Sequence, residues 1–188
     1  MHSRAYAPEA RSAVEQFGAS PFVARAILAL ELPVPSTILD IPCGFGRHTL
    51  WFADLGHQVV AADIDPQRVA HVRSALAEAT HPGKTVVLDA RSRLPFEDAA
   101  FDGAIVIDYV EPALLAQMAR FLRPGGFLIY ETFSARGDNW RGLLLPGEAD
   151  EILGDFFNIT ARMTREVGVD GDRRETTKIT ARRTEKLP

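Results

Sequence analysis

Residues 39–48 read LDIPCGFGRH and hold the pattern that decides the fold. An apolar run ends at Asp40, and two glycines, Gly44 and Gly46, precede a stretch with helical periodicity. Because glycine lacks a Cβ, this pair allows a sharp turn and lets a ligand approach the backbone where the helix begins. The segment therefore predicts a strand, a ligand-binding loop and a helix in succession.

The same alternation of strand and helix continues along the chain. Short apolar runs, several of them β-branched, are typical of buried strands, and segments of helical periodicity separate them. The expected strands are 37–41, 58–63, 85–89, 101–107 and 126–131, and the expected helices are 47–55, 66–79 and 112–122. This alternation favours a parallel sheet with right-handed crossovers and helices on both faces.

The N-terminal part precedes this pattern and is expected to be helical. Residues 1–35 have a helix-like apolar periodicity and predict a helical cap on the main domain, residues 36–188. We expect the two to form one compact domain, because 188 residues suit a single core of good size.

The C-terminal part ends the sheet differently. An irregular stretch is expected over 132–147, followed by a short helix over 148–156. Two β-rich runs, 157–167 and 175–183, then flank an Asp-Gly connection, which is a hairpin signal. The sequence thus predicts a Rossmann-like, doubly wound α/β fold whose seven-stranded, mostly parallel sheet ends in an antiparallel β-hairpin.

Composition narrows the function classes. The chain is 46% hydrophobic and 24% charged, as in an ordinary soluble globular protein. A net charge of −4 and the lack of a long cationic stretch argue against a nucleic-acid or membrane-surface binder. The single cysteine, Cys43, cannot form an internal disulfide, and no apolar run is long enough to span a bilayer. We expect a cytoplasmic protein without membrane attachment.

An acid at the end of the second apolar run adds to the ligand pattern. Asp63 is placed to accept hydrogen bonds from ribose hydroxyls in the crevice at the carboxyl ends of the strands. A nicotinamide-dependent dehydrogenase uses a similar acid, but its fingerprint is G-x-G-x-x-G, and Thr49 stands here where that pattern has Gly or Ala. An NAD(P)-dependent oxidoreductase is therefore the less favoured interpretation.

The loop and its acid resemble the first two motifs of the class I S-adenosylmethionine-dependent methyltransferases, whose loop is written D/E-x-G-x-G-x-G. Asp40 matches the acid, Gly44 and Gly46 match the second and third glycines, and Pro42 replaces the first. Further along, VVLDARSRLPF (86–96), FDGAIVIDYVEP (101–112) and LRPGGFLIYETF (122–133) resemble the later motifs in their usual order. The resemblance covers residues 36–133, and within the family it is nearest to the small tellurite-resistance-type group.

The resemblance implies S-adenosylmethionine as the cofactor and assigns residues to it. It places Asp89 to accept from the adenine amine, Ala90 to donate from its backbone, and Asp108 beside the methionine part. The implied cofactor-binding residues are Asp40, Pro42, Cys43, Gly44, Gly46, Asp63, Ile64, Asp89, Ala90 and Asp108. No metal ligand is implied, and His48 and Cys43 are interpreted as packing residues.

The motifs leave the methyl acceptor open, and we expect a small molecule and not a nucleic acid. Candidate catalytic residues are Asp108 and Tyr109, and candidate substrate-binding residues are Tyr109, Arg136, Trp140 and Arg141. The last three lie in a long irregular stretch, which in a compact domain is typical of a binding loop. Tyr109 could equally be a packing residue and the arginines solvated charges. A non-catalytic or regulatory domain that binds S-adenosylmethionine remains the alternative function.

Overall fold

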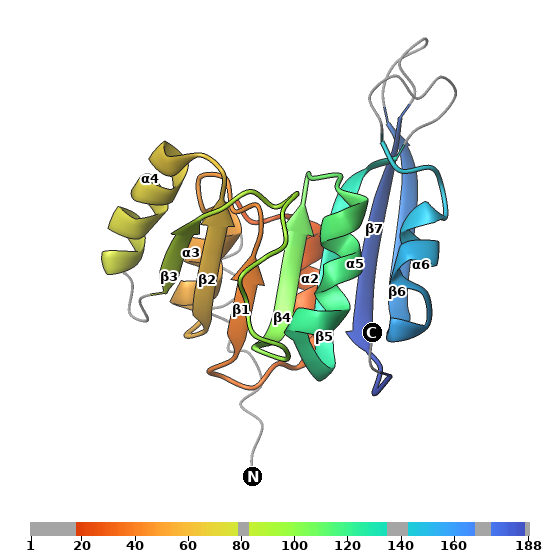
Figure 1. Cartoon of the computed structure of the whole chain (residues 1–188), viewed down its shortest axis with the longest axis horizontal. Helices are drawn as coiled ribbons and strands as arrows, with labels where there is room; N and C mark the ends of the chain where they lie inside the picture. Colours follow the sequence, from red (N-terminus) through yellow and green to blue (C-terminus); the bar gives the residue numbers. More distant parts are fainter. Residues whose placement is uncertain (1–17, 79–82, 135–142, 168–173, 187–188) are drawn as a thin grey trace. The chain divides into compact units, whose positions relative to one another are not determined.

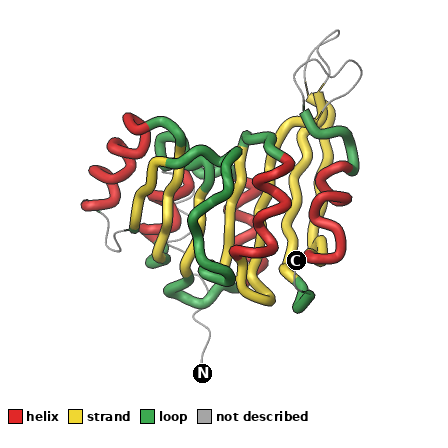
Figure 2. The backbone as a smooth tube through the Cα atoms, in the orientation of Figure 1, coloured by secondary structure: helices red, strands yellow, loops and turns green. Residues whose placement is uncertain are grey.

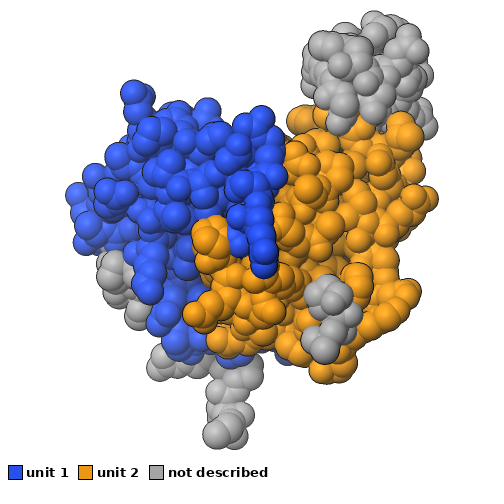
Figure 3. All heavy atoms as spheres, viewed as in Figure 1, with its two compact units in different colours: residues 1–94 blue, residues 95–188 orange. Residues whose placement is uncertain are grey.

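The structure, a computed structural model, describes residues 18–78, 83–134, 143–167 and 174–186. The chain divides into two compact units, residues 1–94 and residues 95–188, which Figure 3 colours separately. The described residues form seven strands, mostly parallel and ending in an antiparallel pair, together with helices between them. The expected Rossmann-like α/β fold class is confirmed.

Unit 1 is a parallel sheet with its connecting helices (Figure 1). Its elements are α2 (Pro21–Leu30), β1 (Thr37–Asp40), α3 (Arg47–Asp54), β2 (Gln58–Asp63), α4 (Pro66–Ala77) and β3 (Lys84–Val87). The strands lie in the order β3-β2-β1, with Asp40 beside Ala61 and Asp63 beside Val87. Because the strands are parallel, their carboxyl ends meet at one edge, where the glycine loop between β1 and α3 also lies.

Two buried histidines hold the N-terminal part of unit 1 in place. The Nε2 atom of His48, on α3, accepts a hydrogen bond of 3.2 Å from the backbone N–H of Ser20, the N-cap of α2. The Nδ1 atom of His57 accepts from the backbone N–H of Ser36, just before β1, at 3.2 Å. Both rings are buried, 5% and 0% exposed, so they satisfy backbone donors that would otherwise lack partners. His48 therefore has the packing role expected from the sequence.

Unit 2 contains the antiparallel end of the sheet, and its strands are drawn in yellow in Figure 2. Its elements are β4 (Phe101–Ile107), α5 (Pro112–Phe121), β5 (Leu122–Ser134), α6 (Glu148–Leu153), a 3-10 turn (Gly154–Phe156), β6 (Phe157–Val167) and β7 (Arg174–Arg183). The strands lie in the order β4-β5-β7-β6, and β4 and β5 are parallel. β7 runs antiparallel to both β5 and β6, so the expected terminal hairpin is confirmed.

β5 is longer than the sequence indicates. Phe101 pairs with Leu122 and Gly103 pairs with Phe127, so the strand begins at residue 122 and not at 126, and residues 123–126 form a bulge within it. An ion pair of 2.7 Å between Arg123 and Asp102 spans it, which gives Asp102 a structural role. The strand then continues to Ser134 because residues 132–134 pair with β7, so the expectation of an irregular stretch from residue 132 was wrong for its first three residues.

Both units have apolar cores built on their strands. In unit 1 Ile38, Leu39 and Phe52 are fully buried, and in unit 2 Ile105 and Leu128 are. Within the described residues, no helix combines the length and the apolar character that crossing a membrane requires.

Candidate functional site

The glycine loop follows β1 and ends where α3 begins, at the N-cap Gly46. The backbone N–H of Cys43 donates to the Ala62 carbonyl of β2 at 2.8 Å, and that of Gly46 donates to the Cys43 carbonyl at 2.9 Å. Gly44 and Gly46 have φ angles of +55° and +82°, which L-residues with a side chain rarely adopt. The loop therefore turns despite Pro42, the departure from the family pattern.

The two glycines serve different purposes. A Cβ on Gly46 would lie 2.8 Å from Cγ2 of Val72 on α4, so Gly46 permits α3 and α4 to pack closely. A Cβ on Gly44 would meet nothing within 4 Å. Gly44 thus leaves open space beside its own backbone, at the helix end where a ligand can approach.

Asp63, at the end of β2, anchors the loop. Its Oδ2 accepts from the backbone N–H of Gly44 at 2.9 Å, and its Oδ1 accepts from the backbone N–H of Asp65 at 3.0 Å. The residue is 2% exposed. A carboxylate has about four acceptor positions, so two backbone donors leave capacity for further hydroxyl donors.

Arg68 on α4 lies over this acid. Its Nη1 is 3.9 Å from Oδ2 of Asp63, its Nε is 3.4 Å from Oδ2 of Asp65, and its guanidinium stands 5.5 Å from the centre of the Phe45 ring. The side chain is 44% exposed, so these contacts are weak and screened by water. Arg68 is a residue of the site that the motif comparison did not predict.

Asp40, the acid of the loop motif, points inward and not toward solvent. Its Oδ2 accepts a hydrogen bond of 2.5 Å from the hydroxyl of Thr49, on α3, and the residue is 2% exposed. Burial raises the pKa of Asp40 to about 7, although hydrogen bonds from the side chain and backbone of Thr49 and the charge of Arg47 oppose the shift. Asp40 therefore fixes the start of α3 relative to β1.

The raised pKa of Asp40 predicts a specific pH dependence of stability. The unfolded chain releases this proton near its ordinary pKa of 3.8, whereas the folded chain keeps it until about pH 7. Between these values the folded state binds more protons, so the free energy of unfolding falls as pH rises, by up to about 1.4 kcal/mol per pH unit. Asp40→Asn keeps an oxygen acceptor for Thr49 and should remove this contribution. Urea unfolding of the cofactor-free protein from pH 4 to 7 measures it.

The control for this series is Glu78→Gln, which removes an exposed carboxylate at the end of α4. We expect the free energy of unfolding of Glu78→Gln to follow the wild-type dependence on pH. The free energy of unfolding of Asp40→Asn should increase relative to that of the wild type as pH rises. Parallel curves for all three proteins would show that Asp40 does not hold its proton in the folded state.

Asp89 follows β3 and has a partner of its own. Its carboxylate accepts hydrogen bonds from three nitrogens of Arg91: the backbone N–H at 2.9 Å, Nε at 2.9 Å and Nη2 at 2.7 Å. These bonds lower the pKa of Asp89 to about 2. Arg91 is 64% exposed, so it can be exchanged for another donor at small cost. The next residue, Ala90, is buried at 6% exposure.

Three large apolar side chains are exposed around these acids. Phe45, Ile64 and Val87 are 65%, 55% and 48% exposed, and each adjoins the carboxyl end of a strand of unit 1. Exposed apolar groups gathered beside polar ones mark ligand-binding surfaces more often than chance. The edge of unit 1 therefore combines an open glycine backbone, two carboxylates and an apolar surface.

The thiol of Cys43 is buried at this edge. Burial and the neighbouring charges of Asp40 and Asp63 raise the pKa of its thiol to about 12, so the thiolate is scarcely populated at neutral pH. The side chain fills the loop, as the sequence interpretation expected.

The candidate residues of unit 2 are only partly described. Asp108 directly follows β4, is exposed, and has a φ angle of +55°, while its backbone N–H donates to the Glu131 carbonyl at 2.7 Å. Non-glycine residues with positive φ are uncommon and are frequent at functional sites. Tyr109 is half-buried. Arg136, Trp140 and Arg141 lie outside the described residues.

Sequence reasoning found three acids of unit 1, Asp40, Asp63 and Asp89, but did not predict their partners. Thr49 departs from the dinucleotide fingerprint, and its hydroxyl donates a hydrogen bond to Asp40. Arg91 carried a signal that could have been used, because an arginine two residues after an aspartate in a turn can bind its carboxylate. Arg68 had a similar signal in its three-residue spacing from Asp65 at the start of a helix.

Comparison with known proteins agrees with this geometry. Residues 38–126 match the family described as "Methyltransferase domain". The chain is 36% identical over 87 residues to an 18S rRNA (guanine-N(7))-methyltransferase of Schizosaccharomyces pombe, covering 46% of this chain and 31% of that protein. It is 35% identical over 103 residues to a demethylmenaquinone methyltransferase of Beutenbergia cavernae, covering 52% and 40%. The chain thus aligns with less than half the length of these relatives.

The fold of the chain is also similar to that of a solved methyltransferase structure. A crystal structure of a SAM-dependent methyltransferase from Methanosarcina mazei superposes with a TM-score of 0.68 at 21% identity, covering 90% of this chain and 99% of that one. At this identity the match speaks for the fold alone. The matched family and the order of the motifs agree with the fold, and together they support a class I S-adenosylmethionine-dependent methyltransferase domain over residues 38–126.

Proposed function

We propose that the chain is an enzyme that transfers a methyl group from S-adenosylmethionine to a small-molecule acceptor. The observation that carries the proposal is the edge of unit 1, where the open backbone of Gly44 lies beside the Asp63 carboxylate at the start of α3. The family match covers this edge in full. S-adenosylmethionine would supply an activated methyl group on a sulfonium, so the protein's own task is alignment and exclusion of water.

The residues of unit 1 fit the parts of this cofactor. Asp63 would use its remaining acceptor capacity for the ribose hydroxyls, and the apolar side chain of Ile64 would lie against the adenine. Asp89 would accept from the adenine amine once Arg91 gives way, with the Ala90 backbone as donor. Pro42, Cys43, Gly44 and Gly46 would form the loop wall, and the buried Asp40 would hold that wall through Thr49 rather than touch the ligand.

Unit 2 would supply groups for the methyl acceptor. Asp108, held in a left-handed conformation after β4, would orient the methionine end of the cofactor. Tyr109 would contact the acceptor, as would Arg136, Trp140 and Arg141. An acceptor that is already a good nucleophile needs no general base, whereas a hydroxyl or ammonium acceptor does.

A small acceptor is favoured by charge. The chain carries a net charge of −4, which opposes the phosphate backbone of a nucleic acid. One relative is named for rRNA and another for a demethylmenaquinone, so RNA is the competing acceptor class and has to be tested alongside. A domain that binds the cofactor without transferring methyl is the second alternative.

Calorimetry with S-adenosylmethionine, followed by transfer of a labelled methyl group to acceptor pools, tests the proposal. We expect binding with release of the demethylated cofactor in the presence of a small-molecule pool. Label recovered in RNA alone would contradict the small-molecule acceptor. Tight binding without transfer to small molecules, RNA or protein would contradict the enzyme.

Asp108 and Tyr109 can be separated by their kinetics. Asp108→Asn retains a residue that tolerates positive φ and removes the charge, so we expect weaker cofactor binding, by about tenfold, with the fold intact. Tyr109→Phe should leave the cofactor Kd unchanged and raise the acceptor KM or lower kcat. Kd from calorimetry and steady-state rates on the identified acceptor check both. A Tyr109→Phe enzyme with wild-type rates would make Tyr109 a packing residue.

A further inference from the structure

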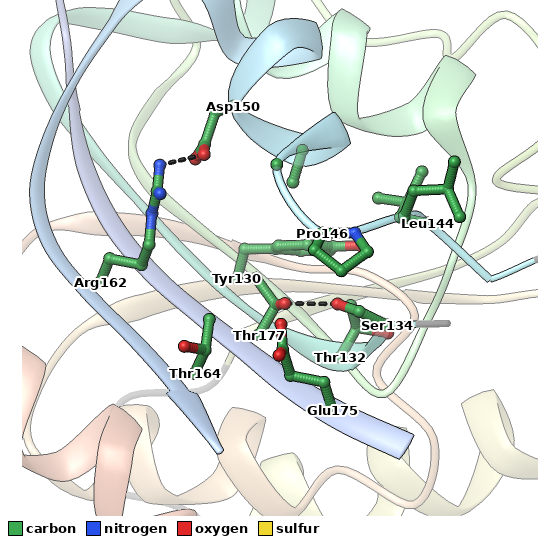
Figure 4. Close-up of a pocket in the computed structure, with 13 residues that line it drawn as sticks. Tyr130, Thr132, Ser134, Leu144, Pro146, Asp150, Arg162, Thr164, Glu175 and Thr177 are labelled. Atoms are coloured by element: carbon green, nitrogen blue, oxygen red, sulfur yellow. Dashed lines mark hydrogen bonds and ion pairs between the residues drawn. The ribbon is translucent and has the colours of Figure 1, made fainter. Parts of the chain in front are cut away.

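A polar cavity lies within unit 2, on one face of the sheet formed by β5, β7 and β6 (Figure 4). Thr132 of β5 pairs with Thr177 of β7, which pairs with Thr164 of β6, so three threonines form one row across the strands. All three line the cavity, as does Ser134, whose hydroxyl is hydrogen-bonded to that of Thr177. A sheet face covered by a helix normally carries apolar side chains, so this row is unusual.

The segment before α6 and the start of α6 form the opposite wall. Leu144, Pro146 and Ala149 line it, and Asp150 on α6 forms an ion pair with Arg162 of β6. The cavity has a volume of about 270 Å³. Pockets for drug-sized ligands have volumes of about 300–1,000 Å³, so this cavity suits a smaller molecule.

The hydroxyl of Tyr130 gives independent evidence for a ligand. Tyr130 is 1% exposed and lines the cavity, and no acceptor among the described residues lies at hydrogen-bond geometry to its hydroxyl proton. Burial raises the pKa of Tyr130 to about 12, although hydrogen bonding from the Thr132 side chain opposes the shift, so the phenol remains protonated and its own O–H is able to donate. A buried donor left unsatisfied destabilises the protein, and a ligand acceptor would remove that penalty.

The charges of the cavity select the kind of ligand. Asp150 and Arg162 neutralise each other through their ion pair. Glu175 of β7 lines the same cavity, is half-buried, and has no ion pair in the described part of the chain. The wall therefore has one negative charge in excess, next to several hydroxyl groups.

We propose that this cavity binds a small hydroxylated amine, whose ammonium group pairs with Glu175 and whose hydroxyl accepts from Tyr130. The threonine row and Ser134 supply further donors and acceptors for a polar ligand of this size. This assignment is independent of methyl transfer, since it concerns unit 2 and needs no cofactor.

Binding of 2-amino-1,3-propanediol to the full chain without cofactor tests the proposal. Glycerol is its uncharged analogue of equal size, and malonate is an anionic probe. We expect the amine to bind at least about tenfold more tightly than glycerol in calorimetry, and malonate not to bind. Equal affinity for the amine and glycerol, or preference for malonate, would overturn the proposal.

Three variants locate the binding. Glu175→Gln should reduce amine affinity to that of glycerol, whereas Glu151→Gln, an exposed carboxylate on α6 outside the cavity, should leave it unchanged. Tyr130→Phe removes the unsatisfied hydroxyl, so the protein should be as stable as the wild type or more so, while affinity for both the amine and glycerol falls about three- to tenfold. Amine binding that survives Glu175→Gln would place it elsewhere and refute the site.

Discussion

Replacing Gly46 by alanine is expected to lower the free energy of unfolding by about 2–4 kcal/mol. The new Cβ would force a φ of +82° on a residue that avoids it and would stand 2.8 Å from Val72. Urea unfolding measures the loss. In the double variant Gly46→Ala/Val72→Ala the close contact is gone while the backbone strain remains. The double variant should therefore lose less stability than the sum of the losses of the two single variants.

Gly44→Ala is the matched comparison for this prediction. Its φ of +55° carries a similar backbone cost, but the Cβ would meet no protein atom within 4 Å, so the loss of stability should be smaller, about 1–2 kcal/mol. The space that Gly44 leaves open is where we propose that the cofactor approaches, so its affinity should fall most in this variant. Equal stability losses for the two variants, or undiminished cofactor binding by Gly44→Ala, would contradict the division of roles.

Asp63→Ala is expected to affect both stability and binding. It removes two hydrogen bonds that backbone N–H groups make to a carboxylate, from Gly44 and Asp65, for a loss of stability of about 2–4 kcal/mol. Affinity for S-adenosylmethionine should fall by at least about tenfold, because a ribose partner is lost and the loop is no longer anchored. Calorimetry at a temperature where the variant is folded, checked by circular dichroism, separates the two effects.

The control for Asp63 is Asp54→Ala, which removes an exposed carboxylate at the end of α3. It should bind the cofactor as the wild type does. Asp63→Asn should lie between the wild type and Asp63→Ala, because one side-chain oxygen remains to accept from one of the two backbone donors. An Asp63→Ala protein that is folded and binds the cofactor undiminished would exclude Asp63 from the site.

The fold was predictable where periodicity is local. The strand Gln58–Asp63 and the start of α4 at Pro66 are as expected, because alternation of apolar runs and a capping Asp65 are visible within a few residues. The length of β5 was not, because residues 132–134 are held in the strand by β7, which lies far along the chain. The strand propensity of a short stretch of sequence does not show whether a distant strand will pair with it.

The candidate site was predictable in its residue types and less so in its arrangement. The motif identified Asp40 and Asp63 as a pair, but the structure gives them different surroundings: Asp40 faces Thr49 in the interior, and Asp63 binds the loop backbone. Orientation of this kind depends on which helix face packs on which strand, and spacing in the sequence does not record it. The roles assigned to Asp89, Asp108 and Tyr109 remain predictions.

The irregular pairing of β6 bears on how copies of this protein meet in concentrated solution. β6 is the last strand in the order β4-β5-β7-β6, and its pairing with β7 is interrupted between Ile159 and Ala161. A second chain cannot add a continuous ladder of hydrogen bonds across such a break, and the exposed charged residues Arg165 and Glu166 oppose a dry contact beyond it. The terminal strand is thereby protected against edge-to-edge association, which is the usual hazard of a long strand at the border of a sheet.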